Sequence, residues 1–286
     1  MGTGTLTASL IEETEGTEKP GAMREAVDAP ELRGVAGEIT CDRFADGAWA
    51  RTPVGVPLEK EITLYVNLQE LVTIQCTPTK LDCLVYGFLY AEGIISGIGD
   101  VASMSVCGTE SMADVRLVNS DYQAPTSRTI TSGCGGGAVF KIDTKKLDSA
   151  FAVAPEEVLS LMKKLQEHIE TRRVTGGMHT SALADRKELL LVTEDIGRHN
   201  TLDKIQGECL MRGIATRDKV LLTTGRVSSE MLLKAARMEA PVVVSRHSPT
   251  GAAVSTARDL GIALVGYVRG GRFTVYAHPE RVGGRA

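Results

Sequence analysis

The sequence predicts an α/β fold with a smaller α+β part on its N-terminal side. From Leu189 onward, short apolar runs alternate with segments of helical spacing, which is typical of a mostly parallel sheet covered by helices. The last two runs flank Arg269-Gly270-Gly271-Arg272, whose glycines suit a tight antiparallel hairpin. In this half we expect strands over 189–193, 219–223, 241–245, 263–268 and 273–277, and helices over 199–212, 228–238 and 250–260.

The N-terminal part is expected to hold four strands and one helix. Thr77 as N-cap and Pro78 at N1 indicate the start of this helix, which ends at Gly93. A further helix begins at Pro155 and runs to about residue 171. The four strands are expected over 62–66, 71–76, 101–106 and 115–118.

Composition and periodicity divide the chain into four segments. Residues 1–37 are rich in Gly, Thr, Glu, Pro and Ala without a sustained period, so we expect a disordered tail. Residues 121–138 also lack a periodic pattern, and a connection of this length is usually functional or disordered. An N-terminal α+β part over 38–120 and an α/β domain over 139–286 complete the expected organisation.

The composition is that of an ordinary globular protein. The 286 residues are 43% hydrophobic and 24% charged, and the formal net charge is −4 at pH 7. This balance argues against non-specific nucleic-acid binding, which needs a broadly basic surface. No apolar run approaches the ~20 residues of a membrane span, and the N-terminus lacks a basic region followed by an apolar core. We therefore expect a cytoplasmic protein that binds neither nucleic acid nor membrane.

The six cysteines have no paired spacing, so we expect reduced thiols. Cys76, Cys83 and Cys209 lie in apolar patterns and are expected to be buried. Cys134 differs, because it sits between glycines in the 121–138 loop and has no apolar neighbour. Accessibility keeps such a thiol reactive. The alternative is a flexible glycine linker that includes a cysteine.

The segment 193–204 is the densest group of polar residues, and it follows directly on an apolar run. A strand is expected to give way to a helix here, and a helix N-terminus at a strand end offers free N–H donors to anions. Asp195, Arg198 and His199 are therefore candidate site residues. The alternative is that Asp195 caps the helix while Arg198 and His199 are solvated first-turn residues.

Other strand ends carry similar side chains. His179 follows two glycines that permit close backbone approach to a ligand. Arg226 and Ser228 lie after the strand at 219–223, and Arg246 follows the next strand. Several strand ends with Arg, Ser, Thr or His would form a pocket for a phosphorylated or otherwise anionic cofactor. The alternative, that each junction merely caps its own helix, explains the serines and threonines better than the arginines.

Together these segments resemble the FdhD family of formate dehydrogenase accessory proteins. The resemblance runs from about residue 61 to residue 281. Its most specific part is the Glu-Asp-x-Gly-Arg-His run at 194–199, followed by Leu202-Asp203-Lys204. The other matching segments are 86–88, 91–95, 131–135, 177–179, Gly225-Arg226, 229–231 and 264–279.

The resemblance implies a cytidine-deaminase-like three-layer α/β/α fold with a mixed, mostly parallel sheet, and a homodimer. It implies a sulfurtransferase that takes persulfide sulfur from a cysteine desulfurase. The sulfur then passes to the molybdenum of bis(molybdopterin guanine dinucleotide), and formate dehydrogenase receives the sulfurated cofactor. By position, Cys134 matches the persulfide cysteine. Tyr267, Val268, Arg269, Gly270, Gly271 and Arg272 match the segment associated with cofactor binding.

The sequence departs from the family at one central position. The family commonly shows Cys-Gly-x-Cys, whereas Cys134 is followed here by three glycines, with Gly137 in place of the second cysteine. A carrier needs one thiolate to hold the sulfane sulfur, and a second thiol would mainly assist its release. The leading hypothesis is therefore sulfur transfer through Cys134. The alternative is a non-catalytic cofactor-binding chaperone that has lost the sulfur chemistry.

A zinc deaminase, the third class that the implied fold suggests, is rejected on the residues. Such enzymes need His-x-Glu and Pro-Cys-x-x-Cys. His179 is followed by Thr180 and Ser181, and the sequence contains no Cys-x-x-Cys. We therefore expect neither a protein metal site nor tightly held zinc.

Overall fold

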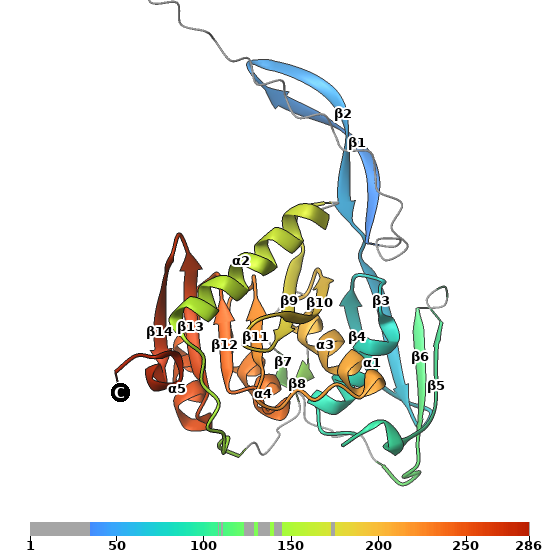
Figure 1. Cartoon of the computed structure of the whole chain (residues 1–286). Helices are drawn as coiled ribbons and strands as arrows, with labels where there is room; N and C mark the ends of the chain where they lie inside the picture. Colours follow the sequence, from blue (N-terminus) through green and yellow to red (C-terminus); the bar gives the residue numbers. More distant parts are fainter. Residues whose placement is uncertain are drawn as a thin grey trace, which may run out of the picture.

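The computed structural model describes residues 35–107, 109, 111–122, 129–130, 138–139, 145–172 and 175–285. These residues form a six-stranded sheet with helices on both faces, a four-stranded sheet beside it, and a two-stranded hairpin that projects from the body (Figure 1). The short strands β7 (Thr129–Ile130) and β8 (Ala138–Val139) pair with each other. Among the described helices, none is long and apolar enough to cross a membrane.

The six-stranded sheet has the order β10-β9-β11-β12-β13-β14. Its three central strands β11, β12 and β13 run parallel, and the remaining pairs are antiparallel. The prediction of a mixed sheet is confirmed, but the sheet is not mostly parallel: two of its five strand pairings are parallel and three are antiparallel, because β9, β10 and β14 join it through hairpin-like connections or antiparallel neighbours. The strands are β9 (His179–Ala184), β10 (Leu189–Asp195), β11 (Val220–Thr223), β12 (Val242–Ser245), β13 (Ala263–Arg269) and β14 (Arg272–Ala277).

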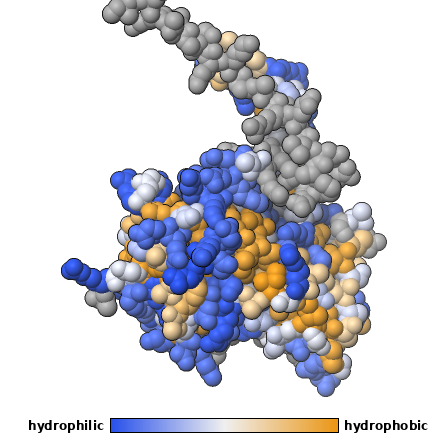
Figure 2. Space-filling view, viewed as in Figure 1, coloured by the Kyte–Doolittle hydropathy of each residue, from blue (hydrophilic) through white to orange (hydrophobic). Residues whose placement is uncertain are grey.

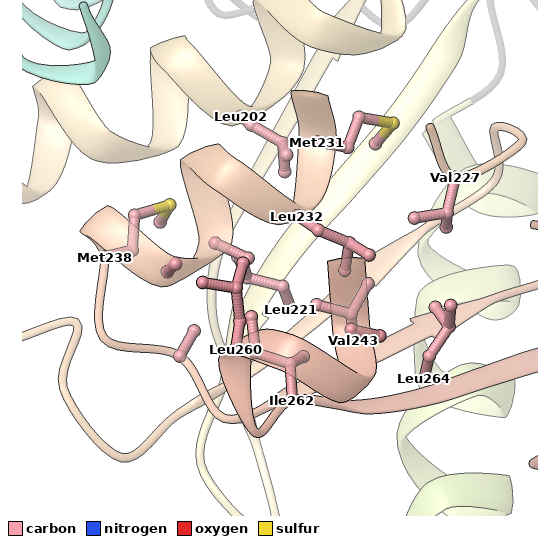
Figure 3. Close-up of a cluster of buried hydrophobic side chains, with 14 of the residues drawn as sticks. Leu202, Leu221, Val227, Met231, Leu232, Met238, Val243, Leu260, Ile262 and Leu264 are labelled. Carbon is pink, nitrogen blue, oxygen red and sulfur yellow. The ribbon is translucent and has the colours of Figure 1, made fainter. Parts of the chain in front are cut away.

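Helices cover both faces of this sheet, because its central strands are apolar on both sides. Along β11, Leu221 faces the cluster formed with α3 (Arg198–Arg212), α4 (Ser229–Arg237) and α5 (Gly251–Leu260), part of which is drawn in Figure 3. Its neighbour Leu222 faces the opposite cluster, which Leu161 and Leu165 of α2 (Pro155–Arg172) complete. The predicted three layers are therefore confirmed.

The second sheet has the order β4-β3-β6-β5 and carries α1 (Leu81–Ala91) on one face. Leu64, Leu84 and Leu89 are fully buried in the core between this sheet and α1. The sequence analysis predicted all four strands to within a few residues. They are β3 (Lys60–Val66), β4 (Gln69–Cys76), β5 (Val101–Cys107) and β6 (Met112–Leu117), with a 3₁₀ turn at Ile98–Asp100.

Two glycines bring α1 and α3 into backbone contact. A Cβ at Gly87 of α1 would overlap the carbonyl oxygen of Asp203, and a Cβ at Gly207 of α3 would overlap that of Cys83. Both glycines have ordinary helical conformations, so the lack of space, and not the backbone, requires them. This contact joins the four-stranded sheet to the six-stranded one.

A buried ion pair lies beside this contact. Lys234 of α4 is 2.5 Å from Asp203, and its Nζ also lies 5.9 Å from the centre of the Phe88 ring on α1. Burial raises the pKa of Asp203, and the charge of Lys234 opposes that rise. Helices α1, α3 and α4 thus meet around the buried Asp203 carboxylate, whose charge Lys234 partly compensates.

The start of α1 differs from the prediction. The helix begins at Leu81, not at Pro78, and Thr77 is not its N-cap. Thr77 instead contacts the other sheet: its N–H donates to Asp195 Oδ2 at 3.1 Å, and its Oγ1 accepts from the N–H of Ile196 at 3.1 Å. Thr77 is buried, and these two hydrogen bonds to the 195–196 segment pair its N–H and its hydroxyl. They take the place of the N-cap hydrogen bond that was predicted for this residue.

The sequence analysis did not predict the hairpin of β1 (Ala36–Ala45) and β2 (Ala48–Pro57). The Asp46-Gly47 turn, in which both residues have positive φ, was an available signal. At the tip, the rings of Phe44 and Trp49 are 5.2 Å apart and mostly exposed.

The outer surface of the body is polar along α2. Figure 2 shows hydrophilic residues along this helix, with hydrophobic residues on either side of it.

Strand β9 was also not predicted as a strand. Four of the five residues after His179 are small or short, Leu183 being the exception, and all five are buried in the interior of the sheet. Ser181 makes hydrogen bonds to the hydroxyls of Thr201 at 2.6 Å and Thr223 at 3.0 Å. Because both faces of the strand are covered, the usual alternation of apolar and polar residues is missing.

Substitution of Gly207 tests the helix contact. Gly207→Ala should lower the free energy of unfolding by about 3 kcal/mol or more, because the methyl group has to displace backbone atoms and not a flexible side chain. Urea unfolding measures the loss. Gly99→Ala is the control, since nothing lies within 4 Å of its Cβ position. Equal stabilities of the two variants would show that the helices are not in backbone contact.

Candidate functional site

One edge of the six-stranded sheet collects the predicted site residues. The parallel strands β11, β12 and β13 end at this edge, and the antiparallel pairing places the start of β9 and the end of β10 there too. His179 accordingly lies opposite Asp195 in the register of β9 and β10. The loops touch as well: the N–H of Tyr267 donates to the carbonyl of His247 at 3.3 Å. We call this edge the strand-end site.

Asp195 lies beneath the strand-end site. Its side chain is 0% exposed and 2.6 Å from Lys204 Nζ, which also donates to the carbonyl oxygen of Thr77 at 3.0 Å. Its Oδ1 accepts from the N–H of Gly197 at 2.8 Å and from the amide of Asn200 at 2.9 Å. The carboxylate thus fixes the turn that leads into α3, which gives it a positioning role.

Arg198, the first residue of α3, is 8% exposed. Within the described part of the chain, its Nε has no hydrogen-bond partner and no carboxylate pairs with its guanidinium. Its side chain lies against Gly225 and near His179: a Cβ at Gly225 would lie 3.2 Å from both Arg198 Cδ and His179 Nδ1. A buried arginine without a counter-ion therefore borders the loop after β11.

The two histidines of the site favour their neutral forms. Burial lowers the pKa of His179, and the charge of Arg198 lowers it further. Burial also lowers the pKa of His199, although Glu230 opposes the shift. His199 Nε2 lies 3.1 Å from Ser228 Oγ and 3.1 Å from Glu230 Oε2. Ser228 is the N-cap residue of α4, but its hydroxyl contacts this imidazole and makes no capping hydrogen bond.

The 267–272 segment forms the hairpin between β13 and β14 at the same edge. Tyr267 is 40% exposed with a φ of 54°, and the guanidinium of Arg269 lies 5.4 Å from its ring centre. Val268 between them is buried in the core on the α2 side. Gly270 and Gly271 have φ values of 58° and 73°, which the tight turn requires. The segment thus alternates exposed side chains with a buried anchor.

No carboxylate of the described residues pairs with the arginines of this edge. Arg198 is buried, whereas Arg226, Arg269 and Arg272 are exposed. Within the described ranges, none of these residues or Arg246 forms an ion pair. A local positive charge therefore exists on a protein whose net charge is −4.

Two cavities differ in their relation to this edge. One of about 180 Å³ opens beside it and is lined by residues that include Gly177, Thr180, Thr224 and Arg246. A larger one of about 390 Å³ lies at the opposite edge of the sheet, where Arg217 precedes β11. The smaller cavity is lined by Thr180 and Glu194, the chain neighbours of His179 and Asp195, and not by those two predicted site residues themselves.

Cys134 lies outside the described residues, as do residues 123–128 and 131–137 of its loop. The predicted burial of Cys76, Cys83 and Cys209 is confirmed. Burial raises the pKa of each of these thiols to about 12, so they stay protonated at neutral pH. Among the described residues, no group of three or more His, Cys, Asp or Glu side chains is placed to hold a metal ion.

Sequence reasoning missed the contacts beneath the site. Lys204 and Asn200 hold Asp195, and Gly225 allows Arg198 and His179 to pack closely against its backbone. A lysine among the apolar positions of the predicted helix was a signal for a buried ion pair. No local pattern indicated which carboxylate it would meet. The binding roles of the strand-end residues stay predictions.

The fold places the chain among the three-layer α/β/α proteins with a mixed sheet, and comparison with known proteins gives the family. The chain belongs to the FdhD/NarQ family, which it matches over residues 57–283. It is 39% identical over 248 residues to the sulfur carrier protein FdhD of Bacillus subtilis (strain 168), which covers 84% of this chain and 95% of that protein. The sulfur carrier protein FdhD of Staphylococcus aureus (strain MRSA252) is 39% identical over 249 residues, covering 84% and 94%.

A solved structure shares the fold. It is described as a candidate formate dehydrogenase accessory protein from Desulfotalea psychrophila. The TM-score is 0.73 at 24% sequence identity, covering 87% of this chain and 99% of that chain. The predicted family resemblance and fold class are both confirmed.

The Asp195–Lys204 pair generates a prediction about stability. Lys204→Met should cost ~3–5 kcal/mol, because it leaves a buried carboxylate uncompensated. The double variant Asp195→Asn with Lys204→Met should recover part of that loss. Lys164→Met is the control, since Lys164 pairs with Glu188 at the surface, where such pairs contribute ~0–1 kcal/mol. Urea unfolding compares the variants, and equal losses in Lys204→Met and Lys164→Met would contradict the assignment.

The lowered histidine pKa values predict a pH dependence. Because His179 and His199 titrate below the ordinary value of 6.5 in the folded protein, the unfolded chain binds more protons near that pH. Their contribution to stability should be complete above pH 6.5 and should be lost as the pH falls through the folded pKa values. NMR titration of the imidazole protons measures both groups directly. A pKa at or above 6.5 for His179 would refute the burial argument.

Proposed function

We propose that this protein is a sulfur carrier that accepts persulfide sulfur from a cysteine desulfurase and passes it to the molybdenum of bis(molybdopterin guanine dinucleotide) for formate dehydrogenase. The observation that carries this proposal is the similarity to two named sulfur carriers over 95% and 94% of their lengths. The uncompensated arginines of the strand-end site support an anionic cargo. We also propose that the working form is a homodimer, as the family resemblance implies.

The sulfur chemistry is assigned to Cys134 on sequence grounds. Its thiolate attacks the outer sulfur of the donor persulfide, a new S–S bond forms, and the donor cysteine leaves as a thiolate. In the second step, the outer sulfur moves to a reduced molybdenum centre, which gives two electrons to make sulfide, and Cys134 leaves as a thiolate. One thiol is sufficient for both steps, so Gly137 in place of the second cysteine does not prevent transfer.

The strand-end site is proposed to hold the cofactor. Arg269 and Arg272 present exposed guanidinium groups, which suit phosphate because their N–H donors are arranged in pairs. The exposed ring of Tyr267 offers a flat surface to a base or a pterin. Val268 would hold this segment in place through the core, and Gly270 and Gly271 would shape its turn. His179, Arg198, His199 and Arg226 would complete the pocket, with Asp195 supporting it from beneath.

Removal of one thiol tests the carrier function. Cys134→Ala should gain no sulfur after incubation with a cysteine desulfurase and cysteine, whereas the wild type should gain the mass of one sulfur atom. Intact-protein mass spectrometry measures the adduct. The control is Cys107→Ala, because Cys107 is a partly exposed thiol in the described structure and has no proposed role.

Formate dehydrogenase activity in a strain that lacks its own accessory protein gives the second readout. Cys107→Ala should restore this activity, and Cys134→Ala should not. An adduct of full size on Cys134→Ala would refute the assignment of this cysteine. A wild type that binds guanine nucleotide but never gains sulfur would favour the chaperone hypothesis.

A further inference from the structure

The burial of Arg198 has no structural explanation among the described residues. Its side chain is more than nine-tenths buried, yet its Nε has no hydrogen-bond partner and its charge has no carboxylate. Buried charges in proteins are normally paired, because removing an ion from water is costly. Nearby, Lys204 and Lys234 follow this rule, with carboxylate partners at 2.6 and 2.5 Å. Arg198 is the exception in the same helix cluster.

Gly225 brings Arg198 and His179 together. Its N–H donates to Thr223 Oγ1 at 3.1 Å, and its carbonyl accepts from Ser245 Oγ at 2.7 Å, so its backbone is fixed. Its φ lies outside the left-handed region, so the backbone conformation does not demand glycine. A Cβ there would lie 3.0 Å from Arg198 Cβ and 3.2 Å from both Arg198 Cδ and His179 Nδ1. The two side chains therefore pack closely against the same backbone position, which a larger residue would crowd.

The charges around Arg198 and His179 favour an anion beside these two side chains. The groups that act electrostatically on His179 are Arg198, His199, His247 and Asp195, and the charge of Asp195 is compensated by its own lysine. Arg198 also begins a helix of fifteen residues whose N-cap is a glycine without a capping side chain. The positive end of the helix dipole therefore adds to the charge of Arg198.

We propose that Arg198 and His179 form a second oxyanion subsite, separate from the 267–272 segment. Strands β9 and β13 are separated by β11 and β12, so the two positions are three strand spacings, or about 14 Å, apart. An extended ligand with two anionic groups can contact both positions. This inference rests on the proposed function for the identity of that ligand, but not for the binding of the oxyanion itself.

Sulfate is the first probe, because its charge is constant over the pH range in which histidine titrates. NMR titration of wild-type protein should show that sulfate raises the pKa of His179, whereas chloride at matched ionic strength should not. Arg198→Gln should lose the response, with affinity for sulfate falling about tenfold or more. Arg272→Ala should keep it, because Arg272 belongs to the other subsite.

Stability separates a binding role from a structural one. Arg198→Gln removes an uncompensated charge, so its melting temperature in chloride should equal or exceed that of the wild type. A residue needed for folding would lower it. Arg198→Lys provides a second variant that keeps the charge and should keep part of the sulfate response.

The proposal is overturned if sulfate leaves His179 unchanged in the wild type, or changes it equally in the wild type and Arg198→Gln. Calorimetry with GDP then tests the wider pocket. GDP binding that is lost in Arg272→Ala, without any sulfate response at His179, would keep the proposed function and reject the second subsite. Failure of sulfur transfer to Cys134 is measured separately and would reject the proposed function while leaving the sulfate result intact.

Discussion

The backbone contact between α1 and α3 is the constraint on which the rest of the structure depends. Gly87 and Gly207 allow the two helices to approach so closely that either side chain larger than hydrogen would meet a carbonyl group of the other helix. Because α1 covers the four-stranded sheet and α3 covers the six-stranded one, this contact sets the position of one sheet relative to the other. Thr77 can reach Asp195 only in this arrangement.

The contact between α1 and α3 also helps to hold the strand-end site in a fixed geometry. Asp195 and Lys204 bind backbone atoms from both parts of the molecule, and they fix the turn from which Arg198 and His199 emerge. The charged groups that would meet a ligand are therefore carried by packed strands and helices. Preorganised groups of this kind lose little freedom when they bind.

Local patterns in the sequence were sufficient for much of this fold. The alternation after Leu189 gave the strands and helices of the main sheet, and the rule that parallel strands end together gave the edge where Arg226 and the 267–272 segment meet. Strand β9 escaped detection because it is buried on both faces and mixes Thr, Ser and Ala with a single Leu, which leaves no alternation. The partners of Thr77 and Lys204, and the unpaired burial of Arg198, depend on contacts more than a hundred residues away or on three-dimensional packing. No local pattern encodes them.

The projecting hairpin supplies the molecule with an optical reporter. Trp49 is the single tryptophan of the chain; it is 71% exposed and lies in β2 next to the turn of the hairpin. The β1–β2 hairpin itself projects away from the two larger sheets (Figure 1). The matched family region starts at residue 57, so nearly all of this arm precedes it. Indole emission depends on contact with water. Any protein that covers the tip will therefore change the intrinsic fluorescence, while a ligand at the strand-end site will leave it unaltered.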